Sequence, residues 1–279
     1  MIAPVVPARL LVSLVGLLLL AAGCGSDRPT YPKAQLTESL QALMMQSGLD
    51  ASVHVVNHTL GVHLSYPGAL EQTDTQIRIG PEFDEAIRKT LTPMHRVLLS
   101  TDAEIDFYVL LISDPQAPNA YLTIVRHMED IRRANVNIID TTEMFARTVY
   151  DFNSMPAQPI SIEQYVSRDI QIEEFLSWQL AKRIQHALTN DLQISEAAEV
   201  GRCTGRFQDG EFVFTLDVSP VAEGPLDEPT IQQMFQASTG VVAKVLSSYA
   251  FESFNTVRLI HPLTGRHLVL PKARLEIFR

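Results

Sequence analysis

Three histidines lie close together in a segment whose pattern predicts a β-hairpin. Residues 52–66 alternate apolar and polar side chains on both sides of Asn57-His58-Thr59. Strand parity places His54 and His58 on one face, and His63 can approach across the turn. Zinc or copper requires three or four converging imidazole, thiolate or carboxylate ligands. Histidines spread over a solvated strand face are far commoner, so we expect neither a metal site nor a cofactor here.

A second group combines carboxylates with basic side chains. Asp102, Glu104 and Asp106 precede a predicted strand, and Arg126 and His127 lie at the end of a neighbouring one. Carboxylates beside a histidine can support acid–base chemistry or bind a cation. The alternative is a set of turn acids with a surface ion pair, which contributes little to stability. We favour that alternative.

Motifs of known enzymes are missing from the chain. It has no GxSxG, HExxH or CxxC motif and no glycine loop that would bind phosphate. We therefore predict no catalytic residue and a function that is not enzymatic. The net charge of −10 argues against nucleic acid or anionic lipid headgroups as the main partner.

Covalent chemistry is predicted only near the N-terminus. Arg9 precedes an apolar run over residues 10–22, which closes on small residues and Cys24. This run is too short to span a membrane, which takes about 20 residues, and it fits the apolar region of a signal peptide. The segment Leu20-Ala21-Ala22-Gly23-Cys24 resembles the lipobox of bacterial lipoproteins, the substrates of signal peptidase II.

This resemblance implies that residues 1–23 are removed and that Cys24 is lipidated and becomes the new N-terminus. Several acyl chains anchor a protein stably to a membrane, so we expect a location in the cell envelope. Gly25, rather than aspartate, follows the cysteine. If the source has two membranes, this favours the outer membrane, facing the periplasm. A soluble secreted protein with a cysteine near its cleavage site is the alternative.

Two similar units are predicted after a polar tether at 24–34. Residues 35–131 show helical spacing at 36–44 and 81–98, and strand patterns at 52–66, 107–112 and 121–125. Their order is α-β-β-α-β-β.

Residues 173–279 repeat this order, with the first helix starting near Ile172 and the second opened by Pro229. Landmarks match at an offset of 147 or 148 residues, such as Pro81 with Pro229 and the helix-breaking Pro93 with Gly240. We therefore predict an α+β fold of two tandem repeats. Each is a two-layer unit with an antiparallel sheet and helices on one face.

A helical linker is predicted at 132–172, with a helix near 141–152 capped by Asp140 and a boundary at 154–159. The strand 107–112 is apolar at nearly every position. We therefore expect cover on both of its faces, from the second unit or from the linker helix. Cys203 is the one cysteine besides Cys24, and we expect it to be buried as a small apolar residue rather than reactive.

In outline, this layout is similar to envelope lipoproteins with paired BON domains, which are non-enzymatic membrane-associated modules. The likeness is one of topology, so no functional residue is carried over. It favours a lipoprotein that binds an unknown envelope protein or organises the cell surface. One alternative is a lipid- or small-ligand-binding lipoprotein, which requires a large apolar cavity between sheet and helices. The other is an envelope enzyme, with a pocket lined by Asp102, Asp106 and His127.

Overall fold

The computed structural model describes residues 30–73, 76–154 and 161–275. The predicted lipobox and most of the predicted boundary at 154–159 lie outside these residues.

The first half contains η1 (Lys33–Gln35, a 3-10 helix), α2 (Leu36–Gln46), β1 (Asp50–Val56), β2 (Thr59–Ser65), β3 (Leu70–Gln72), β4 (Ile77–Ile79), α3 (Phe83–Leu98), β5 (Phe107–Asp114), β6 (Ala117–His127), α4 (Met128–Asn135), α5 (Thr141–Ala146), β7 (Val149–Ser154) and α6 (Ile162–Tyr165). The second half contains α7 (Ile172–Asn190), α8 (Leu192–Ala197), β8 (Ala198–Val200), β9 (Thr204–Gln208), β10 (Glu211–Thr215), β11 (Val218–Pro220), α9 (Glu228–Ser248), β12 (Thr256–His261), β13 (Arg266–Pro271) and α10 (Lys272–Leu275).

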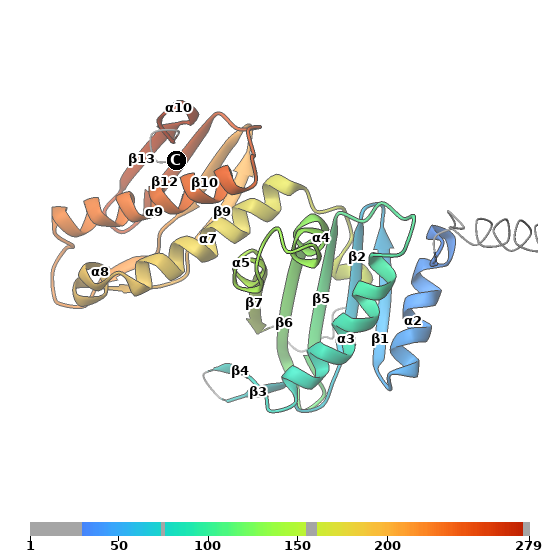
Figure 1. Cartoon of the computed structure of the whole chain (residues 1–279). Coiled ribbons are helices and arrows are strands. Elements are labelled where there is room, and N and C mark those ends of the chain that lie inside the picture. The colour runs from blue at the N-terminus through green and yellow to red at the C-terminus, as the bar shows by residue number, and fades with distance from the viewer. Residues whose placement is uncertain (1–29, 74–75, 155–160, 276–279) are drawn as a thin grey trace, which may run out of the picture.

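Two larger sheets confirm the α+β class (Figure 1). The first has the strand order β1-β2-β5-β6-β7 and the second has the order β13-β12-β10-β9. Both are mixed rather than antiparallel as predicted, because β2 pairs with β5, and β10 with β12, in parallel. In each case a helix, α3 or α9, intervenes in the chain, and such a crossover returns the chain to the sheet in the same direction. When only the strands of the larger sheets are counted, each half contains the α-β-β-α-β-β order, with β3 and β4 inserted in the first half and α8, β8 and β11 in the second. A duplication stays a prediction.

Local sequence explains the two hairpin turns. Asn57 has φ +44° in the two-residue turn between β1 and β2, and Asp209 and Gly210 have φ +52° and +77° between β9 and β10. Asparagine, aspartate and glycine tolerate this left-handed conformation best. The hairpin predicted at 52–66 is therefore confirmed.

The helix landmarks differ from prediction. Pro81 lies two residues before α3, whereas Pro229 lies in the first turn of α9. Pro93 and Gly240 lie inside α3 and α9 and end neither helix. Pro93 is buried with Met94 and Val97, and this packing compensates for the backbone hydrogen bond that proline cannot donate.

Two linking segments also differ from the structure that was predicted for them. The predicted tether at 24–34 already packs on the first unit at its end, where Tyr31 N donates to Ser100 O at 3.3 Å. The predicted helix at 141–152 is capped by Asp140 as expected, but it ends at Ala146, and residues 149–154 form β7. Val149 and Tyr150 pair with β6, and β-branched and aromatic residues favour this pleated, half-buried setting over a helix.

Helices cover both faces of the first sheet: the unit's own helices α2 and α3 lie on one face, as predicted, and α6 and α7 lie on the other. Tyr108, Leu110 and Ile112 of β5 pack in a core with α2 and α3. The alternate residues Phe107, Val109 and Leu111 pack in a second core with α6 and α7. The predicted double cover of β5 is therefore confirmed.

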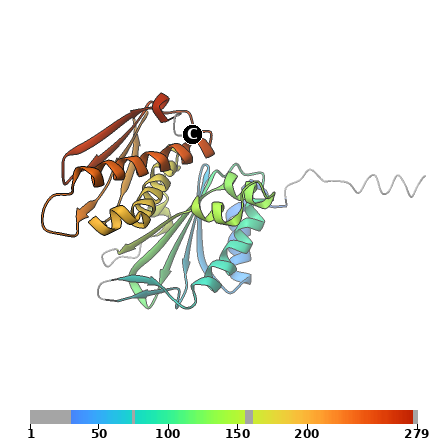
Figure 2. The same ribbon diagram turned by 60° about the vertical axis from the view of Figure 1, so that its left-hand side comes forward.

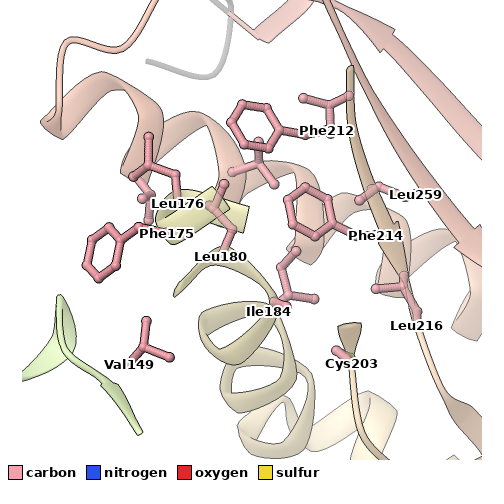
Figure 3. Close-up of a cluster of buried hydrophobic side chains, with 14 of the residues drawn as sticks. Val149, Phe175, Leu176, Leu180, Ile184, Cys203, Phe212, Phe214, Leu216 and Leu259 are labelled. Atoms are coloured by element: carbon pink, nitrogen blue, oxygen red, sulfur yellow. The ribbon is translucent and has the colours of Figure 1, made fainter. Parts of the chain in front are cut away.

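Helix α7 lies between the two sheets (Figures 1 and 2). Its residues Leu180 and Ile184 lie near Phe214 of β10, while Phe175 lies toward Val149 of β7 (Figure 3). The second sheet thus shares one apolar core with the face of the first sheet that carries Phe107, Val109 and Leu111, called the outer face below. Along β12, buried and half-buried residues alternate, which is the pattern of a sheet with one covered face.

Candidate functional site

The three histidines do not converge. His54 pairs with Gly61, and His63 with Ser52, so these two side chains share one face. His58 lies in the turn, and its Nδ1 is 3.8 Å from Asp106 Oδ2. The prediction that His54 and His58 share a face is therefore wrong, because the positive φ of Asn57 turns the chain out of the strand before His58. In the described ranges there is no group of three histidine, cysteine or acidic side chains that could hold a metal.

His63 is held within the sheet instead. Its Nε2 lies 2.8 Å from Ser113 Oγ. Burial lowers the pKa of His63, in spite of the nearby carboxylates of Asp50 and Glu163. A neutral, hydrogen-bonded imidazole is a structural element of the sheet.

The acidic group is dispersed as well. Asp102 Oδ1 accepts a hydrogen bond from Lys33 N at 2.5 Å, and Glu104 is exposed. Arg126 and His127 are consecutive residues of β6 and therefore point to opposite faces of the sheet. Arg126 donates to Thr148 Oγ1 at 3.0 Å, whereas the His127 ring is tilted against the Phe107 ring, with the ring centres 5.0 Å apart. The pocket that would favour an enzyme is not formed by these residues.

A cavity of about 500 Å³ lies elsewhere, between the outer face of the first sheet and α7. Its floor is a row of three valines, because Val109 pairs with Val125 and Val125 pairs with Val149 across β5, β6 and β7. Trp178 and Ala181 of α7 line the opposite side. The segments that precede α7 and β9 contribute further lining residues, among them Tyr165, Arg168, Arg202 and Cys203.

Charged side chains form the rim of this cavity. Asp151 of β7 accepts from Lys182 Nζ through Oδ1 and from Arg202 Nη2 through Oδ2, both at 2.9 Å. Arg168 and Glu174 form a second ion pair, with Nη1 and Oε2 2.8 Å apart. The cavity therefore has an apolar floor and a polar mouth, the usual composition of a small-molecule site.

The lining residues are poorly suited to nucleophilic chemistry. Burial raises the pKa of the Cys203 thiol to about 11, so the thiolate that would attack a substrate is scarce at neutral pH. Burial also raises the pKa of Tyr165, whose hydroxyl lies 2.8 Å from Thr123 Oγ1. Among the described residues that line the cavity there is no histidine to act as a base. The prediction that Cys203 is buried is confirmed, since it is 2% exposed.

The cavity was not predicted from the sequence, although α7 carries a signal for it on a second face. The stripe Leu176, Leu180 and Ile184 packs in the core with the second sheet. Phe175, Trp178 and Ala181 form another apolar stripe at intervals of three residues, and Phe175 packs 5.3 Å from Phe107 of the first sheet. A helix with two apolar faces is buried on both sides, so this second stripe was the available signal.

No family model matches the chain, and no curated protein matches its sequence. The lipobox and the likeness to paired BON domains therefore stay predictions. Cys24 lies outside the described residues. Of the helices that the structure describes, none combines the length and the apolar character needed to cross a bilayer.

Proposed function

We propose that this protein is a lipid-anchored protein of the cell envelope that binds a small molecule and does not transform it. The observation that carries this proposal is the cavity between the valine row and Trp178. Its volume of about 500 Å³ lies within the range of small-molecule sites, roughly 300–1,000 Å³. A ligand there would contact both halves of the chain. The described lining residues include no histidine, the Asp151 and Glu174 carboxylates are held in ion pairs, and the pKa of Cys203 is raised. These features favour binding over catalysis.

Filling the cavity tests the binding function. Protein is purified from its native envelope, and the small molecules extracted from it are identified by mass spectrometry. Val125→Phe adds a ring at the centre of the valine row, so the ligand found with the parent protein should be missing from this variant. Val269→Phe, on the half-exposed β13 position, is the matched control and should keep the ligand. Equal recovery of small molecules from both variants and from the parent would contradict the proposal.

The lipid anchor has its own test. In Cys24→Ala, the protein should remain unprocessed or become soluble, and it should no longer incorporate labelled fatty acid. A variant that still fractionates with membranes and incorporates label like the parent would show that the lipobox assignment is wrong.

Protein binding, the function favoured by the sequence, has one observation in its support. Val136, Ile138 and Phe145 are large apolar residues between the end of α4 and α5, and they are exposed by 65%, 70% and 51%. These three side chains are close in the chain, and neighbouring exposed apolar side chains are candidates for contacts with other proteins. A photo-crosslinker at position 138 in intact cells should then capture one defined partner protein. With the crosslinker at position 136 instead, Ile138→Asp should reduce the amount of this partner that is captured.

A further inference from the structure

Two cations at the rim of the cavity share a single carboxylate. Lys182 Nζ binds one oxygen of Asp151 and Arg202 Nη2 binds the other, at 2.9 Å each. One negative charge thus faces two positive charges. The remaining charged residues of the lining, Arg168 and Glu174, balance each other in their own ion pair.

Among the charged lining residues, three cations thus face two carboxylates, and the Asp217 carboxylate lies next to Gly201 outside the lining. Lysine has three N–H donors and arginine has five, and one donor of each is used by Asp151. Lys182 and Arg202 are 36% and 59% exposed, so their heads lie at the water side of the cavity. The chain as a whole has a net charge of −10, so the positive charge of the cavity lining is opposite in sign to that of the whole protein.

The apolar floor lies directly beneath these cations. Asp151 is two residues after Val149 on β7, and both side chains point to the same face of the sheet. Lys182 follows Ala181 on α7, one turn after Trp178. The cavity therefore places an apolar surface and a cationic pair within the reach of one small molecule.

We propose that the ligand is an amphipathic anion. Its apolar body lies between the valine row and Trp178, and its carboxylate or phosphate group binds Lys182 and Arg202. A charge-assisted hydrogen bond from arginine or lysine to such a group is stronger than a neutral one. This inference rests on the proposed binding function and adds the chemical class of the ligand.

Trp178 makes the test direct, because it is the only tryptophan of the chain and it lines the cavity. The processed chain 24–279 carrying Cys24→Ala is titrated with decanoate, decyl phosphate, decanol and decyltrimethylammonium, all below their micelle concentrations, and tryptophan fluorescence is recorded. Decanoate and decyl phosphate should bind at least about tenfold more tightly than decanol, and the ammonium compound should bind most weakly. Acetate and inorganic phosphate, which lack the chain, should cause no fluorescence change.

Substitutions then separate the head group from the apolar body. Arg202→Gln and Lys182→Gln should each weaken decanoate binding about tenfold and leave decanol binding within twofold. Arg266→Gln, at an arginine of similar exposure that pairs with Glu228 on the second unit, is the matched control and should change neither. Asp151→Asn removes the competing carboxylate and should strengthen decanoate binding, a gain that loss of folding cannot produce.

The outcomes distinguish the two proposals. Equal affinities for decanoate and decanol, with no effect of Arg202→Gln or Asp151→Asn, would overturn the anionic ligand and leave the binding function intact. If none of the four decyl compounds changes the fluorescence of Trp178, the binding function itself fails.

Discussion

Tyr249, the C-cap residue that follows α9, donates a hydrogen bond of 2.7 Å to Asp130 Oδ2 in α4, 119 residues earlier in the chain. Arg147 Nη1 binds the other oxygen of Asp130 at 2.8 Å, and Gln179 Nε2 of α7 donates to the Tyr249 hydroxyl at 2.9 Å. Burial opposes ionisation of Asp130, but His127, Tyr249 and Arg147 outweigh that penalty, so the pKa of Asp130 lies below its usual value. This buried group of side chains joins the two halves of the molecule.

Tyr249→Phe should destabilise the protein by about 1–3 kcal/mol, because it leaves buried hydrogen-bonding groups of Asp130 and Gln179 without their partner. Chemical denaturation measures the change. In a double-mutant cycle with Asp130→Asn, the two effects should be strongly non-additive. Tyr66→Phe is the control, since its hydroxyl only accepts a long contact of 3.5 Å from Lys89, and it should change stability by less than about 0.5 kcal/mol. Additive effects of Tyr249→Phe and Asp130→Asn would contradict the coupling.

His95 should make the protein less stable at mildly acidic pH. Burial and the nearby Arg126 lower its pKa to about 4, while the unfolded chain has a histidine pKa of about 6.5. The folded state therefore favours the neutral ring, and this stability is complete above pH 6.5 and is lost as the pH falls toward 4, by up to about 3 kcal/mol. Thermal melts of His95→Gln should show a flatter dependence on pH over this window.

His267→Gln, at an exposed position of β13, is the control for that measurement and should keep the slope of the parent. The ring of His95 also lies 3.2 Å from the Tyr108 hydroxyl, so His95→Gln should be less stable than the parent at pH 8. An unchanged slope between pH 6.5 and 4 would show that His95 does not titrate in this way.

Gly205→Ala should destabilise the protein by roughly 2 kcal/mol or more, because the interior offers no room for the added methyl group. A Cβ at this position of β9 would lie 2.2 Å from Ser177 O, in the backbone of α7. Gly240→Ala is the matched control, because a Cβ there meets nothing within 4 Å inside α9. That variant should gain about 0.5–1 kcal/mol from the higher helix propensity of alanine. Similar stabilities of the two variants would contradict the close approach of α7 to β9.

Cys203 should react slowly with disulfide reagents in the folded protein. A pKa of about 11 leaves about a hundredth of the thiolate that an ordinary cysteine has at pH 8. Labelling of the chain carrying Cys24→Ala should therefore be at least a hundredfold slower in buffer than in denaturant. Fast labelling of the native protein would show that the thiol is accessible and reactive.

Local sequence determined most of the elements. The apolar spacing from Leu176 to Ile184 belongs to α7, and the asparagine and glycine residues of the two hairpins sit where positive φ values are needed. These features depend on neighbours within a few residues, and such neighbours are visible in the chain itself. The double cover of β5 was also predictable, because alternate residues of a strand lie on opposite faces of the sheet and both sets are apolar in β5.

Tertiary structure alone decided the features that depend on distant partners. Residues 149–154 have an apolar spacing that also fits a helix, and pairing with β6 makes them a strand. The parallel pairing of β2 with β5 depends on where α3 returns the chain. Asp151 meets Lys182 and Arg202 only because β7, α7 and the segment before β9 come together. The sequence contains each of these side chains, but the distances between them result from how the two sheets pack on α7, and no local periodicity encodes that packing.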